Sequence, residues 1–384
     1  MNILLIAPHP FFQERGTPIA VKLLIETLCE FGHKVDLLTF NEGEDIVVDG
    51  LSIFRIPNFS FIQNVPIGFS FKKIMADFFI TVEIISLLRK NDYNIIHAVE
   101  EAIFPAAFLN IFWKKKLVYD MDSSMADQLI EKWGGLGKIS NVLELFENWA
   151  AKRSTAVIPV CKYLAEKIEK YSPQKKIQIL EDIAFKPDYS KNKKENLRIY
   201  VGENDLIGLY IGNLEHYQGI DLLIEGLVKV ETSVPYKVVL IGGSDESIEH
   251  YKAKAEKLGV PNKIKFLGKR PLDQLPFLLE QADILISPRT KGENTPMKVY
   301  SYLASGVPVF ASNIGSHTQA MSSNEVKLFD PNPESFAQNF NELLENENER
   351  IQLGKAGKIL AEENYSLKSY KIKLKNIYNW LEEL

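Results

Sequence analysis

The chain has 384 residues, enough for two domains of ordinary size that each have their own hydrophobic core. Hydrophobic residues make up 46% and charged residues 25%, which is the balance of a soluble globular protein. The 45 Lys and Arg residues against 50 Asp and Glu residues leave a formal charge of −5, which argues against broad nucleic-acid binding and allows only a local basic patch.

The N-terminal segment predicts a cytoplasmic protein. Residues 3–7 are apolar, too short for a signal peptide and without a basic leader, so we interpret them as a buried strand. The longest apolar helical stretch, residues 74–88, contains Asp77 and Glu83 and should not span a bilayer. The two cysteines lie in apolar runs, which is typical of buried thiols in a reducing compartment; they cannot build a disulfide framework or a metal cluster.

In the first half of the chain, short β-rich apolar runs alternate with longer helical patterns, which indicates a parallel sheet covered by helices. The strand at 3–7 leads through a glycine-containing loop into an amphipathic helix over 19–31, which Gly32 ends. Further strands are expected at residues 34–39, 51–56, 95–98, 117–119, 156–160 and 177–180.

The pattern lapses around residues 186–206, where the chain is polar and rich in charge. We therefore predict an N-terminal domain over 1–187, a linker over 188–204, a C-terminal domain over 205–364 and a final helix over 365–384. The elements expected after the linker are strands at 205–211, 236–241, 264–267, 284–287 and 308–311, and helices at 219–230, 248–258, 275–281, 298–304, 334–344, 349–364 and 367–384.

This alternation predicts the α/β class, with two doubly wound Rossmann-like domains in series. In such sheets ligands bind beyond the carboxyl ends of the strands, so the loops from strand to helix matter most. Two facing domains would place the active site in a central cleft.

Two of these loops have a glycine at the start of a helix. Gly16 and Thr17 follow the first strand, and the loop from Gly212 to Gly219 follows the first strand of the second domain. A glycine there lets backbone amides approach an anion, which the helix dipole also favours. Phosphate contact is one interpretation of each loop, and a plain turn between strand and helix is the other.

Residues 287–309 contain the clearest candidate for a ligand site in the sequence. Arg289, Lys291 and Lys298 surround a loop with Gly and Thr that leads into a helix, and Glu293 stands among them. Fixed cations beside free helix-start amides would bind a diphosphate, while the carboxylate would accept hydrogen bonds from ribose or sugar hydroxyls. Solvated basic residues are the alternative, but the position at a strand's carboxyl end favours a ligand site.

The order of these segments resembles the retaining glycosyltransferases of family 4, which share the GT-B fold, over nearly the whole chain. Glu293 stands at the first carboxylate of the family's Glu-x7-Glu block, and residues 304–309 match the Ala-x-Gly-x-Pro-Val turn behind it. The loop 212–219 matches the Gly-Arg-Leu…Lys-Gly loop, and Gly268 matches the loop whose backbone usually reads the nucleobase. The resemblance implies a C-terminal helix that crosses back to the first domain.

In the second domain, the sequence departs from the family at three positions. Ser301 replaces the second carboxylate, and Asn213 and Gln218 replace the Arg and Lys that clamp the donor diphosphate. Our hypothesis is that Arg289, Lys291 and Lys298 together supply the lost charge. The donor-binding residues that we expect are Gly16, Thr17, Gly212, Asn213, Gln218, Gly243, Gly268, Lys269, Arg289, Lys291, Asn294, Thr295, Met297, Lys298 and Ser301.

The candidate catalytic residues are Asp122, Glu100 and Glu293. Asp122 follows a first-domain strand at about the place of the family's histidine and is expected to contact the transferred sugar or the acceptor; Glu100 is the second acceptor-side candidate. A helix N-cap or a surface carboxylate is the alternative for both. Asp120-x-Asp122 also matches the metal pair of the other glycosyltransferase fold, but we expect no metal there. The nearby histidines His97, His216 and His317 are each expected to be structural, and His317 is the best catalytic candidate of the three.

The resemblance implies metal-independent transfer with retention, with a nucleotide-sugar as donor substrate and no cofactor. Protein cations and helix dipoles would stabilise the leaving diphosphate. The basic, aromatic segments 68–80 and 112–116 suggest peripheral contact with the inner membrane surface and a lipid-linked acceptor; a core helix with solvated lysines is the alternative. A sugar or polysaccharide acceptor stays open, as do a non-catalytic sugar-nucleotide-binding or scaffolding relative and, more weakly, a sugar-nucleotide epimerase.

Overall fold

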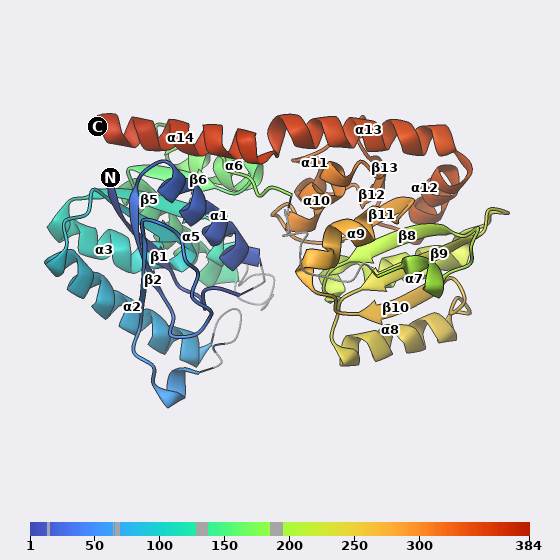
Figure 1. The fold of residues 1–384 in the computed structure, drawn as a ribbon, viewed down its shortest axis with the longest axis horizontal. Helices are drawn as coiled ribbons and strands as arrows, with labels where there is room; N and C mark the ends of the chain where they lie inside the picture. Colours follow the sequence, from blue (N-terminus) through green and yellow to red (C-terminus); the bar gives the residue numbers. More distant parts are fainter. Residues whose placement is uncertain (14–15, 64, 66–69, 128–136, 185–194) are drawn as a thin grey trace. The chain divides into compact units, whose positions relative to one another are not determined.

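The computed structural model describes residues 1–13, 16–63, 65, 70–127, 137–184 and 195–384. This part of the chain forms two compact units, one of Met1–Glu181 with Lys371–Leu384 and one of Asp182–Tyr370 (Figure 1). Each unit has one parallel sheet covered by helices, so the predicted architecture of two Rossmann-like domains is confirmed. Part of the predicted linker (188–194) and of the basic aromatic segment (68 and 69) lies outside the described residues.

The sheet of the first unit has seven strands in the order β3-β2-β1-β4-β5-β6-β7. Neighbouring strands pair in parallel, for example Leu5 with Leu37 on one side and with His97 on the other. Both faces are covered, which explains why these strands are continuous apolar runs. The strands are β1 (Asn2–Ala7), β2 (Lys34–Thr39), β3 (Leu51–Arg55), β4 (Ile95–Val99), β5 (Lys116–Met121), β6 (Ala156–Pro159) and β7 (Lys176–Ile177).

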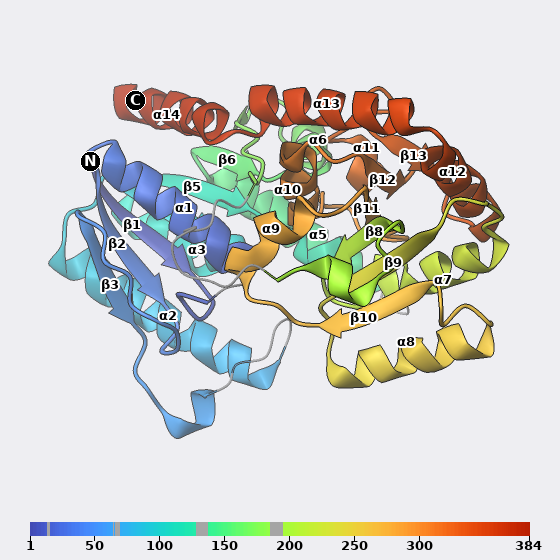
Figure 2. The same cartoon turned by 45° about the vertical axis from the view of Figure 1, so that its right-hand side comes forward.

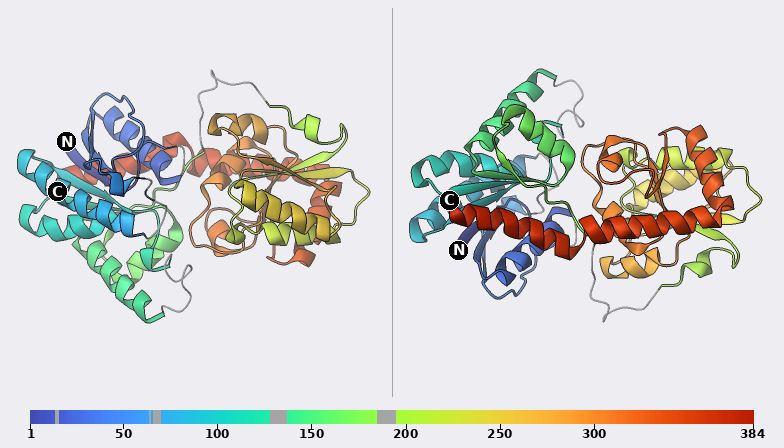
Figure 3. Two further views of the ribbon diagram at one scale, coloured as in Figure 1. Left: turned by 90° about the horizontal axis from the view of Figure 1, so that it is seen from below. Right: turned by 90° about the horizontal axis from the view of Figure 1, so that it is seen from above.

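Helices lie on both faces of this sheet, as the two views of Figure 3 show. One face packs a single apolar core against α2 (Phe71–Lys90), α3 (Ile103–Trp113), α5 (Gly137–Arg153) and α6 (Lys162–Tyr171). The other face carries α1 (Gly16–Glu30) and the end of α14 (Leu367–Glu383). Because strand residues alternate in direction, Ile96 enters the first core while His97 turns to α14.

The sheet of the second unit has six strands in the order β10-β9-β8-β11-β12-β13. The strands are β8 (Leu206–Ile211), β9 (Tyr236–Ile241), β10 (Ile264–Gly268), β11 (Ile284–Ser287), β12 (Val309–Ser312) and β13 (Lys327–Phe329). The helices are α7 (Ile220–Lys229), α8 (Asp245–Lys257), α9 (Leu275–Leu279), α10 (Met297–Ser305), α11 (Gly315–Thr318), α12 (Pro333–Glu345) and α13 (Glu347–Asn364). β10 is an edge strand beside α8 (Figure 2).

A cluster of phenylalanines packs β12 and β13 of this sheet against α12. Phe310 of β12 lies 4.3 Å from Phe329 of β13 between ring centroids. Phe336 of α12 packs on both rings, and Phe340 of α12 packs on Phe310. This packing explains β13, a strand of three residues that the sequence did not predict.

Residues 195–204, which the sequence placed in the linker, fold onto the second unit. The guanidinium of Arg270 donates to the carboxylate of Glu195 at 2.5 and 2.8 Å, and Leu197 is fully buried in the core of that unit. A bidentate ion pair and a buried leucine therefore hold this segment against the second unit. Its charge-rich composition had predicted a linker instead.

In the described part of the chain, every helix is too short or too polar to cross a bilayer.

Candidate functional site

Three glycines bring strand ends into backbone contact at the carboxyl edge of the second sheet. The amide of Gly242, after β9, donates to the carbonyl of Gly268 at the end of β10, at 2.8 Å. A Cβ atom on Gly242 would lie 2.0 Å from the carbonyl oxygen of Gly212, after β8. Only glycine permits this approach, which leaves backbone rather than side chains at the edge where ligands bind in such sheets.

Two loops lock together in front of neighbouring helices. Gly219 has φ +76°, and a Cβ atom there would lie 1.9 Å from the carbonyl oxygen of Pro288. The amide of Thr290 donates to the carbonyl of Tyr217 at 2.9 Å. The loop after β8 is therefore fixed against the loop after β11, and these strands are neighbours in the sheet.

Both loops end at helix N-termini. The N-cap residues are Gly219 for α7 and Pro296 for α10, and neither side chain caps its helix. The first amides of each helix thus remain for another acceptor, and the positive ends of two helix dipoles meet at one sheet edge. Thr295, just before α10, has a buried hydroxyl that lacks a hydrogen-bond partner among the described residues.

Lys298, in the first turn of α10, is the central cation of this edge. Its Nζ donates to the side-chain oxygen of Gln218 at 3.0 Å and lies 3.9 Å from the centre of the Tyr210 ring. Of the described carboxylates, none forms an ion pair with it. Burial and the nearby charge of Arg289 hold the pKa of Lys298 well below its usual value. A half-buried ammonium with neutral partners is costly unless an anion joins it.

Arg289 is tied into its own loop. Its Nε donates to the carbonyl of Lys291 at 2.5 Å, its Nη1 donates to the carbonyl of Asn294 at 2.8 Å, and its guanidinium lies 5.4 Å from the Tyr217 ring centre. A Cβ atom on Gly292 would collide with this guanidinium at 1.9 Å. Arg289 therefore shapes the loop and contributes positive charge to it.

The other residues predicted for this site divide by exposure. Ser301 and Thr295 are buried, Met297 and Asn294 are half-buried, and the remaining side chains are exposed, namely those of Asn213, Lys269, Lys291 and Glu293. The side chain of Gln319 donates to the backbone carbonyl of Glu293 at 2.7 Å, which fixes the backbone beside that exposed carboxylate. Gly243, at the start of the loop after β9, has φ +84°.

His317 is a structural residue, as the sequence led us to expect. Its Nδ1 lies 2.9 Å from the carbonyl of Ser312 and its Nε2 lies 2.9 Å from the hydroxyl of Ser287. Nδ1 therefore donates to the carbonyl, and Nε2 accepts from the hydroxyl. Complete burial lowers the pKa of His317 to about 3, so it stays neutral and pins β11 to β12.

In the first unit, Glu100 follows β4 with φ +49° and accepts a hydrogen bond from the Ser123 hydroxyl at 3.0 Å. Burial, and then the charge of Glu101, raise the pKa of Glu100 to about 7. Burial and Glu101 likewise raise the pKa of Asp77 to about 7, while Lys73 forms an ion pair with Glu101. Three carboxylates thus share one lysine at the carboxyl end of β4.

The loop after β5 lies beside Glu100 and contains Asp122, which is half-buried. Its far end is held by Ser124, whose hydroxyl donates to the carboxylate of Glu147 at 3.0 Å and accepts from Nζ of Lys167 at 2.8 Å. Its near end is held by Asp120, which contacts Nε2 of His97 at 3.1 Å. The backbone around Asp122 is therefore fixed from both sides.

Gly16 and Thr17 begin α1, also in the first unit. Gly16 is exposed, and a Cβ atom there would meet nothing within 4 Å in the described part of the chain, so packing of the described residues does not require this glycine. The described part of the preceding loop is fixed by Arg55, which donates to the carbonyls of Phe11 at 2.7 Å and Glu42 at 3.0 Å.

Two family models divide the chain between them. Residues 15–181 match the model described as Glycosyltransferase Family 4, and residues 190–359 match that of Glycosyl transferases group 1. The chain is a glycosyltransferase.

A relative agrees with this assignment, and solved structures show the fold. The glycosyltransferase is 25% identical over 383 residues to an uncharacterized glycosyltransferase of Methanocaldococcus jannaschii, with 96% of this chain and 95% of the relative covered. Sucrose-phosphate synthase from Thermosynechococcus elongatus has the same fold with a TM-score of 0.79, at 17% identity and with 100% and 99% of the chains covered. Anabaena HepE in complex with UDP has a TM-score of 0.74, at 16% identity and with both chains fully covered. The fold is GT-B.

Sequence reasoning selected most of the polar groups that meet in the second unit of this glycosyltransferase, but it missed their supports. Tyr210 and Tyr217, which lie under Lys298 and Arg289, carry no motif. In the first unit it selected Glu100 and missed Glu101, whose charge adds to the effect of burial in raising the pKa of both Glu100 and Asp77. Periodicity had marked Asp77 only as a charge that interrupts an apolar helix.

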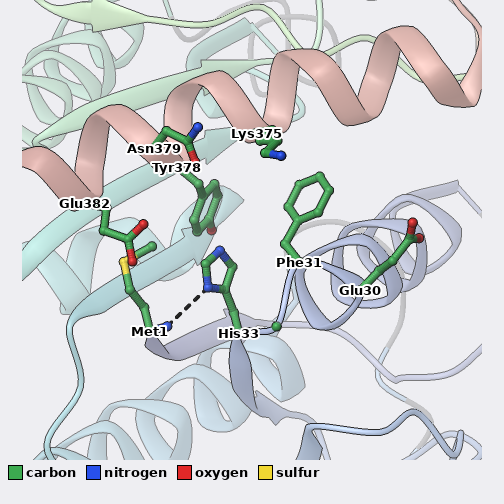
Figure 4. Close-up of a pocket in the computed structure, with 9 residues that line it drawn as sticks. Met1, Glu30, Phe31, His33, Lys375, Tyr378, Asn379 and Glu382 are labelled. Carbon is green, nitrogen blue, oxygen red and sulfur yellow. Dashed lines mark hydrogen bonds between the residues drawn. The ribbon is translucent and has the colours of Figure 1, made fainter.

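A separate cavity of about 460 Å³ lies in the first unit, between the end of α1 and α14 (Figure 4). His33 and Tyr378 stack in its wall, with ring centroids 5.7 Å apart, and Glu30, Glu382 and Lys375 line it. It opens near the amino end of β2, opposite the edge that carries Glu100 and Asp122. The cavity is therefore distinct from the strand-end loops.

Proposed function

We propose that this glycosyltransferase binds the diphosphate of a nucleotide-sugar at the carboxyl edge of the second sheet, between the N-termini of α7 and α10. The observation that carries the proposal is Lys298, a half-buried ammonium whose partners are the neutral side chains of Gln218 and Tyr210. A diphosphate would supply the missing negative charge and accept from the helix-start amides. Lys298 would thereby replace the cations lost at Asn213 and Gln218.

Arg289 and Lys291 would contribute differently to binding of the diphosphate. Arg289 is engaged with its own loop and acts on the diphosphate through its charge, while Lys291 is exposed and would contribute a weaker, screened attraction. The hypothesis of three compensating cations thus becomes one principal cation with two supporting charges.

The nucleobase would lie over the glycine edge formed by Gly212, Gly242 and Gly268. Bare backbone there permits close approach of a planar base and offers amide and carbonyl groups to its edge. HepE, which shares the fold, was crystallised in complex with UDP, so a uridine nucleotide is the donor to test first. Ser301 would face the ribose region with a neutral hydroxyl in place of a carboxylate.

The chemistry that we propose is retaining and independent of metal. Charge develops on the diphosphate as its bond to the sugar breaks, and Lys298 with the two helix N-termini would stabilise that charge. A phosphate oxygen would take the acceptor's proton, so the mechanism needs no dedicated protein base. Glu293 would accept hydrogen bonds from the sugar.

On the acceptor side, Glu100 and Asp122 are the proposed contacts. With a pKa near 7, Glu100 exists in both protonation states at neutral pH and can donate to or accept from an acceptor hydroxyl. A polysaccharide and a lipid-linked sugar both offer such hydroxyls.

A thermal-shift screen of the purified chain against UDP-, GDP-, ADP- and TDP-sugars, with and without EDTA, tests this function. We expect one donor to stabilise the protein selectively and EDTA to leave that shift unchanged. Stabilisation that EDTA abolishes would contradict metal independence. A chain that no donor stabilises would favour the non-catalytic alternative.

A further inference from the structure

The first unit exposes an apolar surface on three adjacent helices. α3 packs between α2 and α5 on one face of the sheet, which Figure 3 shows in cyan to green. We name the outward side of these helices the three-helix face; its exposed apolar residues are Phe71, Ile74, Phe78, Val82, Phe108, Ile111, Phe112, Val142, Leu145 and Phe146.

The spacing of these residues gives each helix a second apolar side. On α2, Phe71, Ile74, Phe78 and Val82 follow one another at intervals of three and four residues and share one side of the helix. The opposite side of α2 is already buried in the core. Phe71 is 77% exposed and Phe78 is 60% exposed, although an ordinary surface helix presents polar residues there.

The middle helix is the clearest case. Residues 103–113 of α3 contain no ionisable side chain, and its outer side consists of Phe108, Ile111 and Phe112, the last 72% exposed. On α5, Val142, Leu145 and Phe146 have the same spacing, and Leu145 is 67% exposed. Exposed aromatic residues gathered on neighbouring helices are typical of an interaction surface.

Basic residues lie along one border of this face. Because the strands are parallel and each helix runs back against them, the C-termini of α2, α3 and α5 meet at the same edge of the sheet. The basic border there consists of Arg89, Lys90, Lys114, Lys152 and Arg153. Since the whole chain has a formal charge of −5, this border is a local reversal of sign.

We propose that the three-helix face binds an anionic lipid bilayer, with its phenylalanines in the interfacial region and its basic border against lipid headgroups. Aromatic residues beside lysines and arginines match the chemistry of that interface. A symmetric pairing of two copies about an axis through that border would instead bring two basic borders together. The proposal rests on the proposed function in one respect, since it implies an acceptor carried by the membrane.

Vesicle flotation of the full chain tests this surface directly. Vesicles of phosphatidylcholine alone and with about a third phosphatidylglycerol should separate apolar from electrostatic binding. We expect the wild type to float with anionic vesicles at low salt and to be released by high salt. The F78E/F112E variant should lose at least about tenfold in bound fraction, and each charge reversal in K90E and K114E about fivefold.

The matched control is V228E/I359E, which places the same charges on exposed apolar positions of the second unit and should float like the wild type. An unchanged melting temperature shows that F78E/F112E is folded. A wild type that stays in solution, or an F78E/F112E variant that floats equally well, would overturn the proposal. So would a wild-type dimer in light scattering that F78E/F112E dissociates, because a second copy would then cover the face.

UDP-sugar binding, measured on the same samples without vesicles, separates the two proposals. It should be equal in the wild type and in F78E/F112E. A wild type that binds a donor but not the vesicles would refute the membrane surface alone, and a wild type that binds the vesicles but no donor would refute the donor site alone.

Discussion

The side-chain oxygen of Gln218 accepts a hydrogen bond from Nζ of Lys298 at 3.0 Å, across two loops that follow neighbouring strands. The two residues are 80 positions apart in the chain. The contact orients the ammonium beside the starts of α7 and α10, where an anion would find both a cation and free amides. Gln218, which lacks the family's charge, therefore acts as a support for the charge of Lys298.

Replacement of Lys298 by methionine should stabilise the protein. The pKa of Lys298 is lowered on folding, so the unfolded chain holds the proton more tightly and folding is penalised at any pH below the unfolded pKa of 10.5. We expect K298M to raise the free energy of unfolding by about 1–2 kcal/mol at pH 7, and the gain to shrink toward pH 10. Chemical denaturation at several pH values measures this.

Lys254 provides the opposite control. Its Nζ donates to Asp221 at 2.5 Å and to Glu225 at 2.6 Å, and these contacts raise its pKa against the effect of burial. K254M should therefore lower the free energy of unfolding at pH 7. Equal destabilisation by K298M and K254M would contradict our view of Lys298 as an uncompensated cation.

Gly219 should tolerate alanine far less well than Gly259. Both have φ +76°, so alanine costs each a similar backbone strain of about 1–2 kcal/mol. At Gly259 no described residue lies within 4 Å of the added Cβ atom, whereas at Gly219 the carbonyl oxygen of Pro288 is 1.9 Å away. We expect G219A to cost at least about 2 kcal/mol more than G259A and to weaken donor binding, as read by thermal unfolding and calorimetry. Similar results for both variants would refute the interlocked loops.

Glu100 should make the stability of the first unit depend on pH. Its pKa is raised from 4.5 to about 7, so the folded chain binds more protons than the unfolded chain between these values, and stability falls as pH rises through that window. E100Q should match the wild type at pH 4 and exceed it by about 1–2 kcal/mol at pH 8. Melting temperatures across this range test the prediction, with the exposed Glu26 changed to Gln as the control. A constant difference between E100Q and the wild type would contradict it.

The Tyr378 hydroxyl should contribute more to stability than a surface tyrosine hydroxyl. Tyr378 is fully buried and its hydroxyl lies 2.7 Å from Nδ1 of His97, whose other nitrogen contacts Asp120. Y378F would leave the buried imidazole without this partner, at a cost of about 1–3 kcal/mol. Y171F removes a more exposed bond to Glu144 at 3.3 Å and should cost less than about 0.5 kcal/mol. Equal losses of unfolding free energy in Y378F and Y171F, measured by thermal unfolding, would contradict a larger contribution from the buried hydrogen bond.

The sequence was most informative where strands are buried on both faces. The strands predicted at 34–39, 236–241 and 284–287 coincide with β2, β9 and β11, because continuous apolar runs between turn residues leave little freedom in their bounds. β13 was missed, since Lys327–Phe329 owes its strand conformation to pairing with β12 and to the phenylalanine cluster.

Only part of the candidate site could be predicted from the sequence. The glycines and cations of the strand-end loops belong to short sequence patterns, so each loop could be predicted as part of a site from its own residues. The pairing of Gln218 with Lys298 and the sharing of Lys73 by three carboxylates depend on elements that meet only in the folded chain. The lowered pKa of Lys298 and the raised pKa of Glu100 follow from burial, which no short motif records.

Calorimetric titration of UDP-sugar, and of GDP-, ADP- and TDP-sugars if it does not bind, into the wild type and K298M in the presence of EDTA tests the central claim most directly. We predict that one donor binds the wild type and that K298M, although more stable, binds it about 10- to 100-fold more weakly. Equal affinity of the two proteins for that donor, or no binding of any donor to the wild type, would contradict a diphosphate site built around Lys298.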